Sequence, residues 1–319
     1  MERVAYLIRR TVEMILVVLV VAVLNFTLIH LAPGDVAVYM AGVEAGPEYV
    51  ASIRHEYGLD LSLYVQMGRY MSRLLHGDFG RSFTRGEAVV DVIMNRMPAT
   101  LLLMGSSLIL GAVLGTLGGA LAARHIGSKV DYWISGLCVA AYSTPVFWLG
   151  LILIYAFSVH LNWFPSSGMM SFLEEQRGIA DTLRHMALPV LSLTVYFIGQ
   201  NIKVARASVA EAMQDDFITT FRAVGFKERE VFLKHGLRNA LLPIVSMTGL
   251  QFTQLTAGAV LTETVFSWPG MGQLVFQAVL SRDYPVIMGG YVLMSIMVVL
   301  FTLLVDFIYV VLDPRIELK

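Results

Sequence analysis

Six long apolar segments constrain the fold of this chain more than any other feature of its sequence. A bilayer core of about 30 Å is crossed by roughly 20 apolar residues in a helix, and only helices or closed barrels satisfy the backbone there. These segments are too long for barrel strands, so we expect an all-α polytopic membrane protein with six transmembrane helices. The approximate spans are 11–31, 99–122, 132–159, 183–204, 240–265 and 286–312.

The charge content agrees with exposure to membrane lipid. Only 15% of the 319 residues are charged and 56% are hydrophobic, whereas soluble domains carry about 25% charged residues. So few charges could hardly cover a water-soluble protein of this size. The net charge of −1 gives no indication of a nucleic-acid partner, and the single cysteine, Cys138, excludes an internal disulfide framework.

The first apolar segment follows Arg3, Arg9 and Arg10 and could be mistaken for a signal peptide. Its apolar core is too long for one, and no small-x-small cleavage site follows it, so we expect an uncleaved first span. With the N-terminus inside, the inner segments carry most of the Lys and Arg residues found in short loops. The positive-inside rule therefore predicts that both termini are cytoplasmic.

The long outer segment, 32–98, carries a helical pattern of its own. Its apolar residues recur at helical spacing at Tyr64, Met67, Tyr70, Met71 and Leu74. We expect a small cap of amphipathic helices on the outer face; a helix lying in the lipid interface is the alternative. The predicted division is the N-terminal residues with the first helix (1–31), the cap (32–98) and a transmembrane core (99–319).

No sequence pattern for catalysis, nucleotide binding or metal binding is visible. The patterns G-x-x-x-x-G-K-[ST] and H-E-x-x-H do not occur, and the seven histidines are scattered. We therefore predict no catalytic residue, no metal ligand and no cofactor bound by this chain.

Two stripes at helical spacing lie within the predicted spans. Small residues in the second span, which could contact another helix of this chain or a partner subunit, are Gly111, Gly115, Gly118 and Gly119. Polar residues in the fifth span are Thr248, Gln251, Gln254, Gly258 and Thr262. Because polar groups are costly in lipid, we interpret the second stripe either as a translocation pathway or as contacts between helices. The pathway candidates are Thr248, Gln251, Gln254 and Glu263.

The segment between the fourth and fifth spans is charged and prone to form helices, although both of its neighbours are apolar. From Asp215 it reads DDFITTFRAVGFKEREVFLKHGLRNALLPIV. The pattern predicts two short helices around a turn at Gly225, with the second helix ending at Pro243. Its charges indicate a cytoplasmic docking element rather than a basic segment resting on anionic lipid. Apolar side chains would anchor it in a partner; they are Phe217, Ile218, Phe221 and Phe226.

This segment resembles the coupling loop of ABC-importer permeases, whose general pattern EAA-x3-G-x9-I-x-L-P is matched only at Gly225 and Leu237. DDFITTFRAVGF and HGLRNALLPIV resemble one branch more fully, the first-permease subunits of the dipeptide/oligopeptide/nickel family. That branch has D-[YF]-[IV]-x-T-x-R-A-x-G followed by H-x-L-R-N-A-L-L-P-[IV]. The resemblance continues along nearly the whole chain, at HLAPGD, GDFGRSF, RMPATLLL, TETVFSWPGMGQLVFQAVLSRDYPV and LDPRIELK. The chain departs from the family at Val36, often proline there, and in its short loop between the third and fourth spans.

The resemblance implies a type I ABC-importer permease fold in the bacterial cytoplasmic membrane, with coupling helices in the loop 205–239. It also implies a homologous second permease, two cytoplasmic ATPase subunits that bind ATP and Mg, and an extracytoplasmic substrate-binding protein. Trp268 and Pro269 would shape an outer turn before the sixth span. The predicted ATPase-coupling residues are Phe217, Thr220, Arg222, Ala223, Gly225, Phe226 and Arg238.

The expected function is ATP-driven import of di- or oligopeptides, with this chain as a permease subunit that is not itself an enzyme. Nickel or another metal chelate, glutathione and sugars are alternatives; the short loop before the fourth span is shared with nickel-type members. A stand-alone secondary transporter would need coupling charges in several spans, where only Asp306 is clear. An intramembrane enzyme would need paired catalytic residues.

Overall fold

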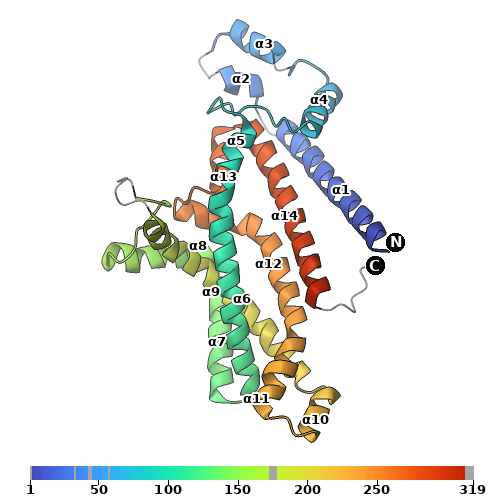
Figure 1. The fold of residues 1–319 in the computed structure, drawn as a ribbon. Coiled ribbons are helices and arrows are strands. Elements are labelled where there is room, and N and C mark those ends of the chain that lie inside the picture. The colour runs from blue at the N-terminus through green and yellow to red at the C-terminus, as the bar shows by residue number, and fades with distance from the viewer. Residues whose placement is uncertain (1, 32–33, 42–44, 57, 172–177, 313–319) are drawn as a thin grey trace. The chain divides into compact units, whose positions relative to one another are not determined.

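The apolar segments fold as long helices in the computed structural model, which describes residues 2–31, 34–41, 45–56, 58–171 and 178–312 (Figure 1). Side chains at 2–8, 252–259, 306 and 308–312, and with them Asp306, lie outside the description. Regular structure across the described ranges is helical, apart from an isolated bridge between Arg81 and Ala88. The chain divides into two compact units: 1–98 with 274–299, and 99–273 with 300–318.

The first unit contains the helices of the predicted cap. Its elements are α1 (Glu2–Leu31), α2 (Val36–Ala41), α3 (Pro47–Glu56), α4 (Leu63–Leu75), α5 (Val89–Met94), most of α13 (Met271–Ser281) and the start of α14 (Tyr284–Leu312). His30 of α1 stacks on Phe26, and its Nε2 lies 3.1 Å from Gln66 Oε1 of α4. The predicted apolar face of α4 is half-buried except at Tyr64, which is 91% exposed.

Asp283 joins two distant loops of the first unit. Its buried carboxylate accepts hydrogen bonds from Ser82 Oγ (2.5 Å), Phe83 N (3.1 Å), and both N and Oγ1 of Thr84 (3.2 and 2.8 Å). A carboxylate that receives this many donors is well compensated for its burial. The sequences GDFGRSFT and SRDYPV therefore form one structural feature, although about 200 residues separate them.

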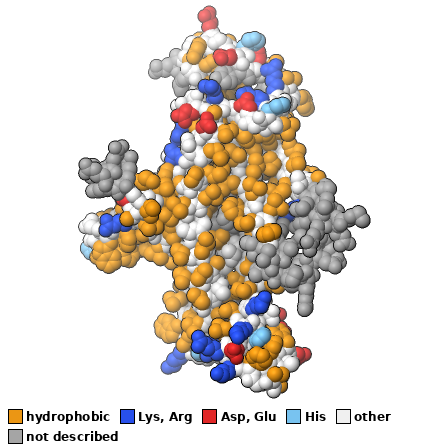
Figure 2. All heavy atoms as spheres, viewed as in Figure 1, with side chains coloured by type: hydrophobic (Ala, Val, Ile, Leu, Met, Phe, Trp, Pro, Cys, Tyr) orange, Lys and Arg blue, Asp and Glu red, His pale blue; other side chains and the backbone are white. Residues whose placement is uncertain are grey.

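The second unit contains the remaining long helices and the charged segment. Its elements are α6 (Met97–Arg124), α7 (Lys129–Ser143), α8 (Val146–Leu153), a π-helical turn at Ile154–His160, α9 (Ile179–Ala212), α10 (Asp216–Ala223), α11 (Glu228–Glu230), a π-helical turn at Val231–Gly236, and α12 (Leu237–Val265). Figure 2 shows hydrophobic side chains over the long helices of this unit, and Lys and Arg side chains gathered where α10 and α11 lie.

The glycine stripe of α6 packs against α9 of the same chain. A Cβ added at Gly115 would lie 2.5 Å from the Cβ of Asn201, and one added at Gly119 would lie 2.5 Å from the Cβ of Ala205. Such close backbone approach is how membrane helices associate without a hydrophobic drive. Of the two partners that the sequence allowed for this stripe, the structure shows another helix of the same chain.

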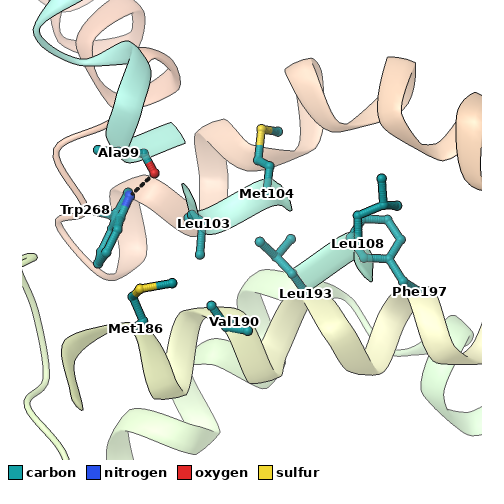
Figure 3. Packing of buried hydrophobic residues seen from close by; sticks show 9 residues of the cluster. All are labelled: Ala99, Leu103, Met104, Leu108, Met186, Val190, Leu193, Phe197 and Trp268. Carbon is teal, nitrogen blue, oxygen red and sulfur yellow. Dashed lines mark hydrogen bonds between the residues drawn. The ribbon is translucent and has the colours of Figure 1, made fainter. Parts of the chain in front are cut away.

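A hydrophobic cluster fills the contact between α6 and α9 (Figure 3). Trp268, from the turn after α12, is fully buried in it, and its indole Nε1 donates a hydrogen bond to Ala99 O at 2.8 Å. The other members are Ala99, Leu103, Met104, Leu108, Met186, Val190, Leu193 and Phe197. The core thus fixes the turn after α12 to the start of α6.

The third predicted span is not one straight helix. Its residues form α7 and the combined helix 146–160, which meet at a bend of 97°. Thr144 has an extended backbone (φ −80°, ψ 124°) because it precedes Pro145, whose ring disfavours helical conformation at the preceding residue. The bend is a correction to the predicted continuous span at 132–159.

Four helices among the described residues are long and apolar enough to cross a membrane, and the bent pair would make a fifth span. The four are Arg9–Leu31, Val89–Arg124, Ile179–Ala212 and Tyr284–Val305. The fifth predicted span falls on α12, which contains side chains outside the description. The count of six therefore stays a prediction.

Candidate functional site

The charged segment between α9 and α12 folds as predicted around Gly225. This glycine has φ of +93°, in the region that side chains rarely adopt. A Cβ added there would meet no atom within 4 Å. The backbone conformation, and not the available space, therefore requires glycine at this turn between α10 and α11.

Aromatic side chains hold the two short helices together. The ring of Phe221 stacks on His235 with centroids 3.7 Å apart and planes inclined by 18°. Phe226 meets Phe221 edge-on at 5.4 Å, and Phe217 does so at 6.4 Å. These four side chains therefore form a small aromatic cluster within the segment, and all of them are partly accessible to solvent.

An exposed ion pair closes the turn across Gly225. Arg222 Nε donates to Glu228 Oε2 at 3.1 Å, and Arg222 Nη2 donates to Glu228 Oε1 at 2.7 Å. The Arg222 guanidinium holds the pKa of the Glu228 carboxyl below its usual range. The charge of Arg222, one of the predicted coupling residues, is thus matched inside the segment.

The burial of Ile218 corrects part of the predicted docking anchor. It is fully buried within the chain, as is Val231, because both face inward from the segment. Phe232 is also buried, against Ala120 of α6 and Val209 of α9. These residues anchor the segment to its own helices, so Ile218 is not available to a partner.

The helical run after Gly225 does not stop at Pro243. It continues through the π-helical turn Val231–Gly236 into α12, and Pro243 lies inside that helix. Proline is tolerated in membrane helices where local π-helical adjustment and neighbouring helices satisfy the freed backbone groups. The segment is therefore connected rigidly to α12, which corrects the predicted break.

The outward face of the segment combines the predicted residues with two that the sequence analysis missed. Thr220, Ala223, Gly225 and Arg238 are exposed, Phe226 is 41% exposed and Phe217 is half-buried. Two further apolar side chains, Val224 (72% exposed) and Leu233 (46% exposed), lie on this segment. Their only sequence signal is that they are apolar residues within a charged stretch.

Two of the pathway candidates connect α9 and α12. Gln251 is fully buried; its Oε1 accepts from Asn201 Nδ2 and its Nε2 donates to Gln200 Oε1, both at 2.9 Å. Thr248 is half-buried, and its Oγ1 donates to Ile244 O at 2.9 Å. Gln254 and Gly258 lie outside the described side chains. In this structure Gln251 thus makes the interhelical contacts that were the alternative to a pathway.

Glu263, the fourth pathway candidate, is fully buried in the last turn of α12. Its carboxylate accepts hydrogen bonds from Thr100 Oγ1 at 2.7 Å and from Gln273 N at 2.9 Å. A side chain at Gly270 would overlap this carboxylate. Glu263 therefore lines no open path here; it organises the turn that contains Trp268 and Pro269.

Metal-ligating side chains do not gather in the part of the chain that the structure describes. No three of its His, Cys, Asp and Glu side chains lie together as a metal site would require. The buried acids instead bind protein donors: Asp131 of α7 accepts from Arg206 of α9 at 2.5 and 2.8 Å.

Family models match almost the whole chain. The model for "Binding-protein-dependent transport system inner membrane component" matches residues 115–318, and the model for the N-terminal region of such membrane components matches residues 3–104. The oligopeptide transport system permease protein AppB of Bacillus subtilis is 38% identical over 98% of this chain and 99% of its own length. The glutathione transport system permease protein GsiC of Escherichia coli is 38% identical, with the same coverage.

A solved structure shares the fold. A chain of the MetNI methionine ABC transporter, in an inward-facing conformation, matches with a TM-score of 0.58 and 19% identity. The match covers 70% of this chain and 97% of that one. The chain thus has the fold of an ABC transporter permease.

Proposed function

We propose, because this chain belongs to the family of binding-protein-dependent transport system inner membrane components, that it is the permease subunit of an ATP-driven peptide importer. The observation that carries the proposal is the similarity along 98% of the chain to a protein named as an oligopeptide permease. Glutathione is the second candidate substrate, since a relative with equal coverage is named as a glutathione permease. Glutathione is itself a small peptide, so the two candidates share their chemistry.

The segment 205–239 is the proposed contact with the ATPase subunits. Three features support this role: the turn at Gly225, the exposed apolar side chains of Val224 and Phe226, and the position of the segment in the chain between the long helices α9 and α12. The proposed coupling residues are Phe217, Thr220, Arg222, Ala223, Gly225, Phe226 and Arg238, to which we add Val224 and Leu233. ATP and Mg²⁺ are bound by the ATPase subunits in this proposal, and not by this chain.

The proposed assembly contains a homologous second permease, two ATPase subunits and a substrate-binding protein on the opposite side of the membrane. The distribution of Lys and Arg supports a cytoplasmic location for both termini and for the segment 205–239. The helices α2, α3 and α4 would then form a cap on the outer face. A pathway role for Thr248, Gln251, Gln254 and Glu263 stays a prediction that applies to another conformation of the chain.

Co-purification tests this assembly. The chain, tagged and isolated in mild detergent from its native membrane, is expected to bring with it an ATPase subunit and a second permease, both identified by mass spectrometry. The Val224→Asp variant serves as the control for contact through the segment, because it places a charge on the exposed apolar surface. A monodisperse homo-oligomer that transports without an ATPase would overturn the proposal.

A further inference from the structure

Four polar side chains, two of them fully buried and two half-buried, form a ladder of hydrogen bonds between α9 and α12. Asn201 Nδ2 donates to Gln251 Oε1 and to Phe197 O, each at 2.9 Å. Gln251 Nε2 donates to Gln200 Oε1 at 2.9 Å, and Thr248 Oγ1 donates to Asn201 Oδ1 at 3.4 Å. Asn201 and Gln251 are both fully buried. The amides of the two helices therefore bond to each other directly.

Neighbouring helices confine the same level of α9 from other sides. Gly115 of α6 approaches so closely that an added Cβ would lie 2.5 Å from the Cβ of Asn201. A Cβ added at Gly199 would lie 2.9 Å from Cys138 O of α7. The ladder is thus located at a level of α9 against which both α6 and α7 pack closely.

Breaking the ladder leaves buried polar groups without partners. An unpaired amide costs far more in a lipid-surrounded protein interior than in water, because no solvent replaces the lost hydrogen bond. Movement of α9 past α12 along the helix axis would separate Gln251 of α12 from both Asn201 and Gln200 of α9 at once. The two helices are therefore held in one register at this level.

The whole segment 205–239 lies in the chain between Asn201 and Gln251. Helix α9 runs from Asn201 to Ala212, a short turn at 213–215 leads into α10, and α12 runs from the π-helical turn to Gln251. We infer that Asn201 and Gln251 are positioning residues that make α9, the segment and α12 move as one body during transport. This inference rests on the proposed function, because it concerns how a movement of the segment 205–239 is transmitted to the part of α12 beyond Gln251.

The test measures ATP hydrolysed per substrate imported. The complete complex is reconstituted in proteoliposomes, with tritiated trialanine as the probe and tritiated glutathione where the wild type does not import trialanine. In the Gln251→Met and Asn201→Leu variants we expect this ratio to rise by about fivefold or more, the lower end of ordinary coupling effects. We expect the KM for the probe to stay unchanged, since Asn201 and Gln251 are fully buried in this conformation.

Three further variants serve as a control, a restoration and a milder form of the same change. Ser246→Ala removes an exposed hydroxyl of α12 that donates to Leu242 O of its own helix, and it should leave the ratio at the wild-type value. Asn201→Gln combined with Gln251→Asn restores an amide pair and should recover most of the coupling. Gln200→Met removes only the outer acceptor, so it gives a milder variant if the central ones do not assemble.

The outcomes separate this inference from the proposed function. Wild-type complex that shows no ATP-dependent import of either probe overturns the proposed function. Wild type that imports, with Gln251→Met and Gln200→Met at an unchanged ratio, overturns only the ladder inference. A change in the KM of the probe at a constant ratio also overturns it, because that result assigns Gln251 to the substrate pathway. A lower melting temperature with import and hydrolysis reduced in parallel indicates a merely structural role and likewise contradicts positioning.

Discussion

Before α12 the chain turns at Gly225, with open space around the glycine; after α12 it turns at Gly270, against a fully buried carboxylate. Gly225 has φ of +93° and is solvated, whereas Gly270 is required because a side chain would overlap Glu263. The first turn has an exposed ion pair and exposed apolar side chains, as a surface for a partner would. The second is built from internal hydrogen bonds to the buried side chains of Glu263 and Trp268. Helix α12 thus lies between an exposed turn at Gly225, which is suited to contact with a partner subunit, and a turn at Gly270 that is held by internal hydrogen bonds.

Removing the carboxylate of Glu263 is expected to have the largest effect on stability. Glu263→Ala leaves Thr100 Oγ1 and Gln273 N without their acceptor, which should destabilise the second unit by about 2–5 kcal/mol. Thermal unfolding of the detergent-purified protein measures this change. Glu13→Ala, which removes a glutamate exposed on α1, is the control and should unfold close to the wild-type temperature. Equal melting temperatures for the two variants would contradict the proposed difference between the exposed turn at Gly225 and the internally bonded turn at Gly270.

Gly225→Asp is expected to abolish uptake while the subunit still inserts in the membrane. The substitution forces a side chain into left-handed backbone at a cost of about 1–2 kcal/mol, and it adds a charge to the proposed docking surface. Gly86→Asp is the matched control, because Gly86 has φ of +70° and equally open surroundings outside the segment. Uptake assays and membrane immunoblots should show loss of transport for Gly225→Asp only. Transport by Gly225→Asp at the level of the control would contradict a coupling role.

Val224→Asp tests whether the exposed turn at Gly225 is a docking surface, and it does so without changing the backbone conformation. Val224 is 72% exposed, so the substitution should leave the fold intact. The affinity for the ATPase subunit should fall by about tenfold, equivalent to 1.4 kcal/mol. Titration of purified ATPase against the permease in nanodiscs measures the affinity. Leu75→Asp, at a residue 76% exposed in the first unit, should bind as the wild type does; equal loss in both variants would point to a general effect of added charge.

The smallest effect is expected for the ion pair across Gly225. The pKa of Glu228 is lowered by Arg222, so the pair contributes stability above the ordinary glutamate pKa and loses it as pH falls through the lowered value. Both groups are exposed, so Glu228→Gln should cost less than about 1 kcal/mol. The melting temperature of wild type should drop slightly on acidification, and that of Glu228→Gln should lack this part of the drop. A large effect at neutral pH would show that the turn relies on this pair more than its exposure allows.

Local signals in the sequence predicted the helices and the turn at Gly225 well. Apolar runs of sufficient length indicate membrane helices, and a glycine between charged helical runs indicates a turn. The bend at Pro145 had a local signal as well, but the apolar run around it masked that signal in a reading based on hydropathy. Tyr64 fitted the helical periodicity of α4 and is nevertheless exposed, because periodicity does not show where an apolar face ends.

Tertiary partners were beyond the reach of the sequence. Thr100, the hydroxyl partner of Glu263, lies 163 residues away, and no local pattern connects the two. Asn201 interrupted an apolar span without indicating that Gln251 would pair with it. Ile218 shared its apolar character with the neighbouring aromatic residues, so only packing could show that it faces inward.

Uptake of tritiated trialanine into proteoliposomes, with ATP hydrolysis recorded in the same vesicles, tests the central claim most directly. Complexes of the permease with its second permease, ATPase subunits and binding protein should import the probe only when ATP is present. The same complex with Gly225→Asp should show no import, while Gly86→Asp supports it. Import by this chain without an ATPase, or ATP-driven import by Gly225→Asp at the wild-type rate, would contradict the account.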